Sequence, residues 1–224
     1  MNEPADVSRF RRRFVDAVSR NEISLAGNWA RPCHAVNVQA ELDSRARDGL
    51  EQAQDLIVKM DPALLRCPRS SLHVSIDWPL EVEYEYAKPK VSLLEEHRIA
   101  WVSGLEEIVS RFAPLTLHYR WVVVTNSAVI ALAEPNDALT QLRHAIRAEL
   151  SFPQPVRPAA TIVHTTLFRF SGALDCPDSF LRSTAAIDLD VTTTVTALVL
   201  SEELVYPSLT TRTLAGFEFG TRAT

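Results

Sequence analysis

The sequence lacks the cysteine and metal-ligand patterns that build structural zinc sites and disulfide frameworks. Its three cysteines, Cys33, Cys67 and Cys176, are widely spaced and form no C-x-x-C pair, so we expect free thiols. The sequence offers no compact cluster of Asp, Glu and His residues. We therefore expect neither a metal site nor a bound cofactor.

A long apolar run and an excess of basic residues are also missing. No stretch approaches the roughly 18 to 20 apolar residues of a membrane helix. There is no signal-peptide pattern either, so we expect a cytoplasmic or otherwise intracellular protein without membrane contact. The formal net charge of −5 argues against a basic surface that wraps long nucleic acid, whereas a small phosphate ligand in a local pocket is compatible with it.

What is present is the composition of an ordinary globular protein. Of the 224 residues, 46% are hydrophobic, which is enough to bury a full core. We predict a single bilobal domain over residues 1–224, monomeric, in which residues 1–27 form an N-terminal helical extension.

Hydrophobic periodicity predicts a mixed order of helices and strands. Helices are expected over residues 7–20, 42–60, 93–112, 137–150 and 178–186. Strands are expected over residues 28–40, 71–78, 115–124, 128–133, 161–170, 191–200 and 213–219. Pro79 is expected to end the second of these strands, and residues 125–127 to form a hairpin turn.

Two strand motifs, about ninety residues apart, are the most informative feature of the chain. The first reads SLHVSIDWPL and the second TIVHTTLFRF, and each places a histidine two residues before a hydroxyl. Because side chains alternate between the two faces of a strand, His73 shares a face with Ser75, and His164 shares a face with Thr166. Four other histidines lack a hydroxyl at this offset: His34, His97, His118 and His144.

The surroundings of the two motifs also repeat. The order strand, helix, proline-bearing loop and histidine strand is expected over residues 33–78 and again over 120–170. An arginine stands seven residues before each motif histidine, Arg66 in the first copy and Arg157 in the second. This order predicts an internal duplication in which the histidine strands occupy equivalent places.

The motifs resemble the two signatures of the two-histidine (2H) phosphoesterase superfamily, which includes LigT-like RNA ligases and cyclic phosphodiesterases. The family pattern is histidine, apolar, Ser or Thr, apolar. The first copy, HVSI, meets it at every place, while the second, HTTL, departs from it at Thr165. The resemblance covers residues 29–219. It implies an α+β fold of two pseudo-symmetric lobes, each a small, mainly antiparallel sheet backed by helices, with a central cleft.

The chemistry of a phosphodiester suits these residue types. Opening one requires a base for the attacking oxygen and an acid for the departing oxygen, on opposite sides of the phosphorus. Two histidines with pKa values near 6.5 can divide these roles without a metal. We predict His73 and His164 as the catalytic pair, and Ser75 and Thr166 as phosphate-binding donors. Which histidine is the base stays open.

The resemblance implies a nucleotide or a short RNA end as substrate, in the first place a 2′,3′-cyclic phosphate opened to a 2′-phosphate. Relatives also act on 2′-5′ linkages and join RNA ends, so both activities stay open. A non-catalytic nucleotide-binding module is a second hypothesis. The third is an unrelated α/β protein whose two histidines are structural and lie far apart.

Several other residues are candidates for substrate contacts. Phe168 is expected either to stack on a nucleobase or to pack in the core. Arg66 and Arg157 are expected either to reach a phosphate or to lie as ordinary loop arginines. Three loop tyrosines are candidates for the rim of a pocket: Tyr84, Tyr86 and Tyr206.

Overall fold

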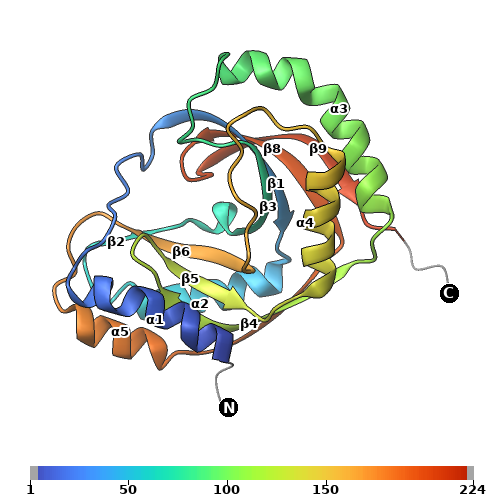
Figure 1. Cartoon of the computed structure of the whole chain (residues 1–224). Helices are drawn as coiled ribbons and strands as arrows, with labels where there is room; N and C mark the ends of the chain where they lie inside the picture. Colours follow the sequence, from blue (N-terminus) through green and yellow to red (C-terminus); the bar gives the residue numbers. More distant parts are fainter. Residues whose placement is uncertain (1–4, 221–224) are drawn as a thin grey trace.

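The computed structural model describes residues 5–220, which form two antiparallel sheets with helices on their outer faces (Figure 1). The first sheet contains, in spatial order, β3 (His73–Leu80), β1 (Pro32–Glu41), β8 (Ala197–Val205) and β9 (Thr210–Glu218). The second contains β2 (Leu64–Arg66), β6 (His164–Phe170), β5 (Val129–Ala133), β4 (Leu115–Val124) and β7 (Asp188–Val195). The α+β fold with two sheet lobes is therefore confirmed.

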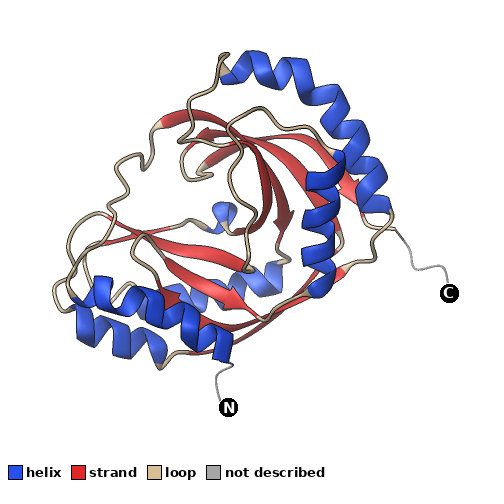
Figure 2. Ribbon diagram, viewed as in Figure 1, coloured by secondary structure: helices blue, strands red, loops and turns tan. Residues whose placement is uncertain are grey.

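Helices cover the outer face of each sheet (Figure 2). On the first sheet these are α3 (Lys90–Ser110) and α4 (Asp137–Glu149). On the second they are α1 (Ala5–Ser19), α2 (Ser44–Ile57) and α5 (Pro177–Ala185). Helix α1 lies within the predicted N-terminal extension and packs on α5 and β4; residues 1–4 and 221–224 of the predicted unit lie outside the described residues.

The two histidine strands pair in a similar way in the two sheets, although β3 is an edge strand and β6 also pairs with β2. Strand β3 pairs antiparallel with β1, and β6 pairs antiparallel with β5. In each copy the helix between the paired strands packs on the other copy's sheet: α2 contacts β6 and β7, while α4 contacts β3. The predicted order of elements is thus present twice, and the exchanged helices tie the lobes together.

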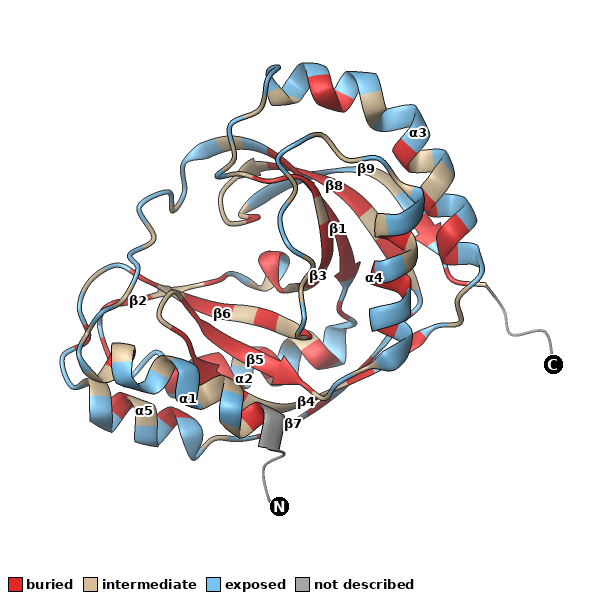
Figure 3. Ribbon diagram, viewed as in Figure 1, coloured by how far each residue is buried: buried red, intermediate tan, exposed pale blue. Residues whose placement is uncertain are grey.

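Local sequence explains how these helices begin and which face they bury. Asp43 caps α2, its side chain accepting a hydrogen bond from Ala46 N at 2.7 Å, and Asn136 caps α4 by accepting from Leu139 N at 2.8 Å. Such caps satisfy backbone donors that the first helical turn leaves free. Buried residues lie on the helix faces turned toward the sheets and on the strands, while the outer helix faces are exposed (Figure 3).

Three details of the strands differ from the sequence-based expectation. The strand expected over 191–200 is two strands in different sheets, because the chain leaves β7 and enters β8 across Thr196 without a Gly or Pro to mark the change. Strand β3 continues through Pro79 to Leu80. It is an edge strand that pairs only with β1, so a residue without a backbone N–H is tolerated there. The three-residue strand β2 was not expected.

One buried arginine joins the two histidine strands. Arg143 on α4 is 4% exposed and donates to Ser75 O at 2.9 Å and to Ile76 O at 3.2 Å in β3. Its guanidinium also donates to Ala160 O at 3.2 Å and to Ile162 O at 3.0 Å, just before β6. A guanidinium has five N–H donors in a rigid plane, so this side chain fixes the spacing of both strands at once.

Replacing Arg143 with Met should destabilise the fold, because it leaves these carbonyls without their donor. A hydrogen bond to a charged group contributes about 1.5–3 kcal/mol. The free energy of unfolding in urea should therefore fall by at least about 3 kcal/mol. Arg98→Met, at an exposed position of α3, should change it by less than about 0.5 kcal/mol. Equal effects of the two substitutions would contradict the bridging role of Arg143.

Candidate active site

The two histidine strands meet where the sheets face each other. The Thr165 hydroxyl on β6 donates to His73 O on β3 at 3.0 Å and lies 2.8 Å from the hydroxyl of Tyr119. Thr165 is 1% exposed. The position where the second motif departs from the family pattern thus carries a hydrogen bond between the lobes, which an apolar side chain could not make.

One pocket of about 360 Å³ is lined by all four site residues predicted from the sequence, His73, Ser75, His164 and Thr166. We call it the histidine pocket. Its lining comes from both sheets and from loops around residues 24, 127 and 207. The arrangement excludes the hypothesis that the two histidines lie far apart in separate cores.

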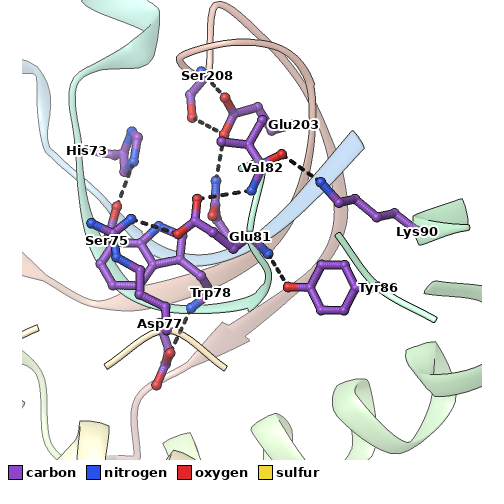
Figure 4. A network of polar contacts seen from close by, with 12 residues as sticks. His73, Ser75, Asp77, Trp78, Glu81, Val82, Tyr86, Lys90, Glu203 and Ser208 are labelled. Atoms are coloured by element: carbon purple, nitrogen blue, oxygen red, sulfur yellow. Dashed lines mark hydrogen bonds and ion pairs between the residues drawn. The ribbon is translucent and has the colours of Figure 1, made fainter. Parts of the chain in front are cut away.

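His73 has a defined orientation. Its Nδ1 lies 2.8 Å from Ser71 O, and because a carbonyl only accepts hydrogen bonds, Nδ1 carries the proton. Its Nε2 lies 3.1 Å from Ser75 Oγ in the pocket (Figure 4). Burial lowers the pKa of His73 below its ordinary value; the hydrogen bond to Ser71 O opposes this shift, and the charge of Arg47 adds to it. The Nε2 of this neutral ring accepts from the Ser75 hydroxyl, and it can instead accept a proton from a ligand or a water that displaces this contact.

His164 is held differently. Its Nδ1 is buried and has no hydrogen-bond partner among the described residues. Burial lowers the pKa of His164 to about 4, and the nearby charges of Arg143 and Arg169 add to the effect, as does His73. The ring is therefore neutral at neutral pH, and an anion bound beside it would favour its protonation.

A bulge in β6 decides which side chains after Thr166 reach the pocket. The register with β5 shifts between Thr166 and Phe168, so that one extra residue is accommodated in β6 and the alternation of faces is interrupted. Phe168 is fully buried in the core, and Arg169 lines the pocket. Strict alternation of side chains places Phe168 on the same face as His164 and Thr166, and this prediction is wrong. Alternation also gives no reason to expect Arg169 in the pocket, because a bulge leaves no clear mark in the sequence.

The two candidate loop arginines have different surroundings. Arg157 lines the histidine pocket, lies 4.4 Å from the ring centroid of Trp78 and donates to Glu81 at 2.7 Å. Arg66 instead binds Asp55 at 2.5 Å and does not line the pocket. Arg157 and Arg169 are thus the two arginines that line this pocket, and guanidinium groups are well suited to binding a phosphate.

Acidic residues also line the pocket, namely Glu81, Glu83 and Glu203. Glu203 is 5% exposed and accepts from Asn37 Nδ2 at 2.9 Å and from Ser208 N at 2.8 Å. Burial raises its pKa, while the hydrogen bonds from Ser208 and Asn37 act in the opposite direction. Figure 4 shows the contacts of this carboxyl with Ser208 and, separately, those of Glu81 and its backbone with Val82 and Tyr86.

Three further expectations concern cysteines, metals and membranes. The three cysteines are free. Within residues 5–220, no three His, Cys, Asp or Glu side chains are arranged to hold a metal ion. None of the described helices is long and apolar enough to span a membrane.

In the ligand-free protein we expect the His164 ring to titrate near pH 4, about 2.5 units below an exposed histidine. Adding inorganic phosphate should raise this pKa, since a negative charge beside the ring stabilises the imidazolium. Proton NMR of the ring C–H resonances, assigned with His164→Gln, measures both. A ligand-free pKa at or above 6.5 would contradict the buried, cation-rich surroundings described above.

The fold resembles that of several solved proteins. No family model matches the chain, and no match among curated proteins is significant. TT0787 of Thermus thermophilus superposes with a TM-score of 0.64 and 17% identity, over 84% of this chain and 99% of that one. E. coli LigT gives 0.59 and 16%, over 85% and 99%. A protein described as a phosphoesterase gives 0.58 and 18%, over 84% and 99%.

E. coli LigT has also been solved in complex with 3′-AMP, with ATP and with NADP+. At these low identities the similarity establishes the fold. The chain therefore has the LigT-like fold that its two motifs implied.

Proposed function

We propose that the chain is a metal-independent phosphodiesterase of the 2H phosphoesterase type. Its substrate is a nucleotide or an RNA-terminal phosphoester, and its reaction opens a 2′,3′-cyclic phosphate to a 2′-phosphate. The observation that carries the proposal is that His73 and His164, each beside a hydroxyl two residues on, line one pocket with two arginines.

The pocket has side chains that can bind one phosphate. Arg157 and Arg169 can donate to phosphate oxygens, and Ser75 and Thr166 line the same pocket with hydroxyls that can also donate to them. The LigT complexes with 3′-AMP, ATP and NADP+ support a nucleotide as the carrier of that phosphate, since the fold is shared.

The proposed reaction needs two proton transfers. A water oxygen bonds to phosphorus while the bond from phosphorus to O3′ breaks, and the displaced oxygen lies opposite the attacking one. One imidazole takes the proton of the water, and the other gives its proton to O3′. The product carries a 2′-phosphate and a free 3′-hydroxyl, and the two rings have exchanged protonation states.

A bound phosphate provides the protonated partner that this scheme needs. Both histidines have lowered pKa values in the free protein, so neither ring is cationic at neutral pH. The negative charge of the ligand raises both values, and the ring nearer the departing oxygen can then hold a proton. Substrate binding and formation of the acid are thereby coupled.

Cleavage of a 2′-5′ linkage, or its reversal as RNA ligation, would use the same atoms. In each case a ribose hydroxyl takes the place of water or of the leaving oxygen. A substrate panel separates these activities from hydrolysis of a cyclic phosphate. The panel comprises nucleoside 2′,3′-cyclic phosphates, short RNAs with cyclic-phosphate ends and 2′-5′ dinucleotides.

Alanine at His73 or His164 should lower kcat by at least about 100-fold on the best substrate of that panel, because general acid–base catalysis contributes about 10²–10⁴-fold. Steady-state kinetics with a chelator present throughout measure this. His144→Ala, at an exposed position of α4, is the matched control and should keep full activity. Near-normal turnover by either site variant, or loss of wild-type activity with the chelator, would refute the mechanism.

The pH dependence should reflect the lowered pKa values. kcat/KM reports the free enzyme. In the free enzyme, the histidine that acts as the acid has a pKa below 6.5, so it loses its proton as the pH rises past that pKa. kcat/KM should therefore peak below pH 6.5 and fall toward neutrality. kcat reports the complex, in which bound phosphate raises the pKa values, and it should therefore persist to higher pH. A kcat/KM that still rises between pH 6.5 and 8 would contradict this assignment.

A further inference from the structure

A second pocket, of about 610 Å³, adjoins the histidine pocket. The two share Val82 and Tyr206 in their linings. Tyr206 also lies 6.0 Å from the guanidinium of Arg169, which lines the first pocket. We call the second one the tyrosine pocket, because its lining includes Tyr84, Tyr86 and Tyr206.

The wall between the two pockets is held in place by side chains of the second. The Tyr86 hydroxyl accepts a hydrogen bond from Glu81 N at 2.8 Å. Lys90 donates to Val82 O at 2.7 Å and lies 5.7 Å from the ring centroid of Tyr86. In Figure 4, His73 lies on one side of this wall and Lys90 on the other. The tyrosine pocket is therefore a structurally defined pocket that adjoins the histidine pocket.

The remaining side chains of the tyrosine pocket suit a nucleotide. Arg31, Lys88 and Lys90 line it against one acidic residue, Glu85, although the whole chain carries a net charge of −5. Aromatic faces interleaved with cationic side chains are the usual means of holding a single-stranded nucleic acid, since every base has a face to stack and every unit carries a phosphate.

Two of these side chains are available to a ligand. The ring of Tyr84 is half-buried and makes no hydrogen bond or ring contact with the other described residues. The guanidinium of Arg31 is exposed and has no ion pair within residues 5–220. Lys88, in contrast, already pairs with Glu96 at 2.6 Å. Tyr84 and Arg31 are thus the candidates for base stacking and phosphate binding.

We infer that the tyrosine pocket binds a second nucleotide, so that the substrate class is a short RNA end and not a free mononucleotide. This inference rests on the proposed function, in which the terminal cyclic phosphate lies in the histidine pocket. The preceding nucleotide then stacks on Tyr84 and places its phosphate near Arg31. The net charge of −5 disfavours a longer basic path along the surface, which limits recognition to a few nucleotides.

The test compares two substrates, a nucleoside 2′,3′-cyclic phosphate and a dinucleotide ending in the same cyclic phosphate. The wild-type kcat/KM should be about tenfold higher for the dinucleotide, as one additional stacked base provides. Tyr84→Ala and Arg31→Ala should each remove most of this advantage and leave the mononucleotide unchanged. Tyr84→Phe should keep the advantage, because a ring suffices for stacking, and Arg98→Ala is the exposed arginine control.

Failure of this inference is separable from failure of the proposed function. Equal kcat/KM for both substrates, or a Tyr84→Ala effect that is the same on both, would overturn the second subsite while leaving the chemistry intact. If neither substrate is turned over, calorimetry with 3′-AMP and with a 3′-phosphate-ended dinucleotide decides the question. If the dinucleotide binds more tightly than 3′-AMP and Tyr84→Ala abolishes the difference, the second subsite is supported. If both ligands bind with equal affinity, the second subsite is refuted.

Discussion

The spacing of the two histidine strands depends on one buried guanidinium. Arg143 reaches from α4 to carbonyls on both sides of the cleft. Carbonyl acceptors satisfy its donors without neutralising its charge, and although burial lowers the pKa of Arg143 to about 10, the group stays cationic at neutral pH. That charge is one of the causes of the low pKa of His164. A single side chain thus contributes to both the geometry and the electrostatics of the pocket, although burial is the larger cause of the low His164 pKa.

In the proposed function, His73 and His164 together carry fewer protons when the pocket is empty than when it holds a phosphate. Buried imidazoles with guanidinium groups nearby are neutral, and in the proposed function a bound phosphate would favour their protonated form. Arg157 contributes less free charge than Arg169, since it is already paired with Glu81 and stacked on Trp78. Its planar side chain is better suited to orienting a ligand than to attracting one from a distance.

Much of the fold was predictable because it rests on local patterns. The order of elements and the shared face of His73 and Ser75 follow from hydrophobic periodicity and side-chain alternation. What could not be predicted depends on contacts between distant segments. The role of Arg143 can be recognised only when α4 is known to lie against β3. The place of Arg169 in the pocket can be recognised only when the register of β6 on β5 is known. In the sequence both look like ordinary surface arginines.

The passage of the chain from β7 to β8 limits how the lobes can move. Only Thr196 separates two strands that belong to different sheets, so the lobes are covalently continuous at that point without a flexible linker. Large hinge opening would have to break strand pairing on one side of that residue. Any change of shape that accompanies ligand binding is then expected in the peripheral loops, such as the one that carries Tyr206, and not between the two sheets.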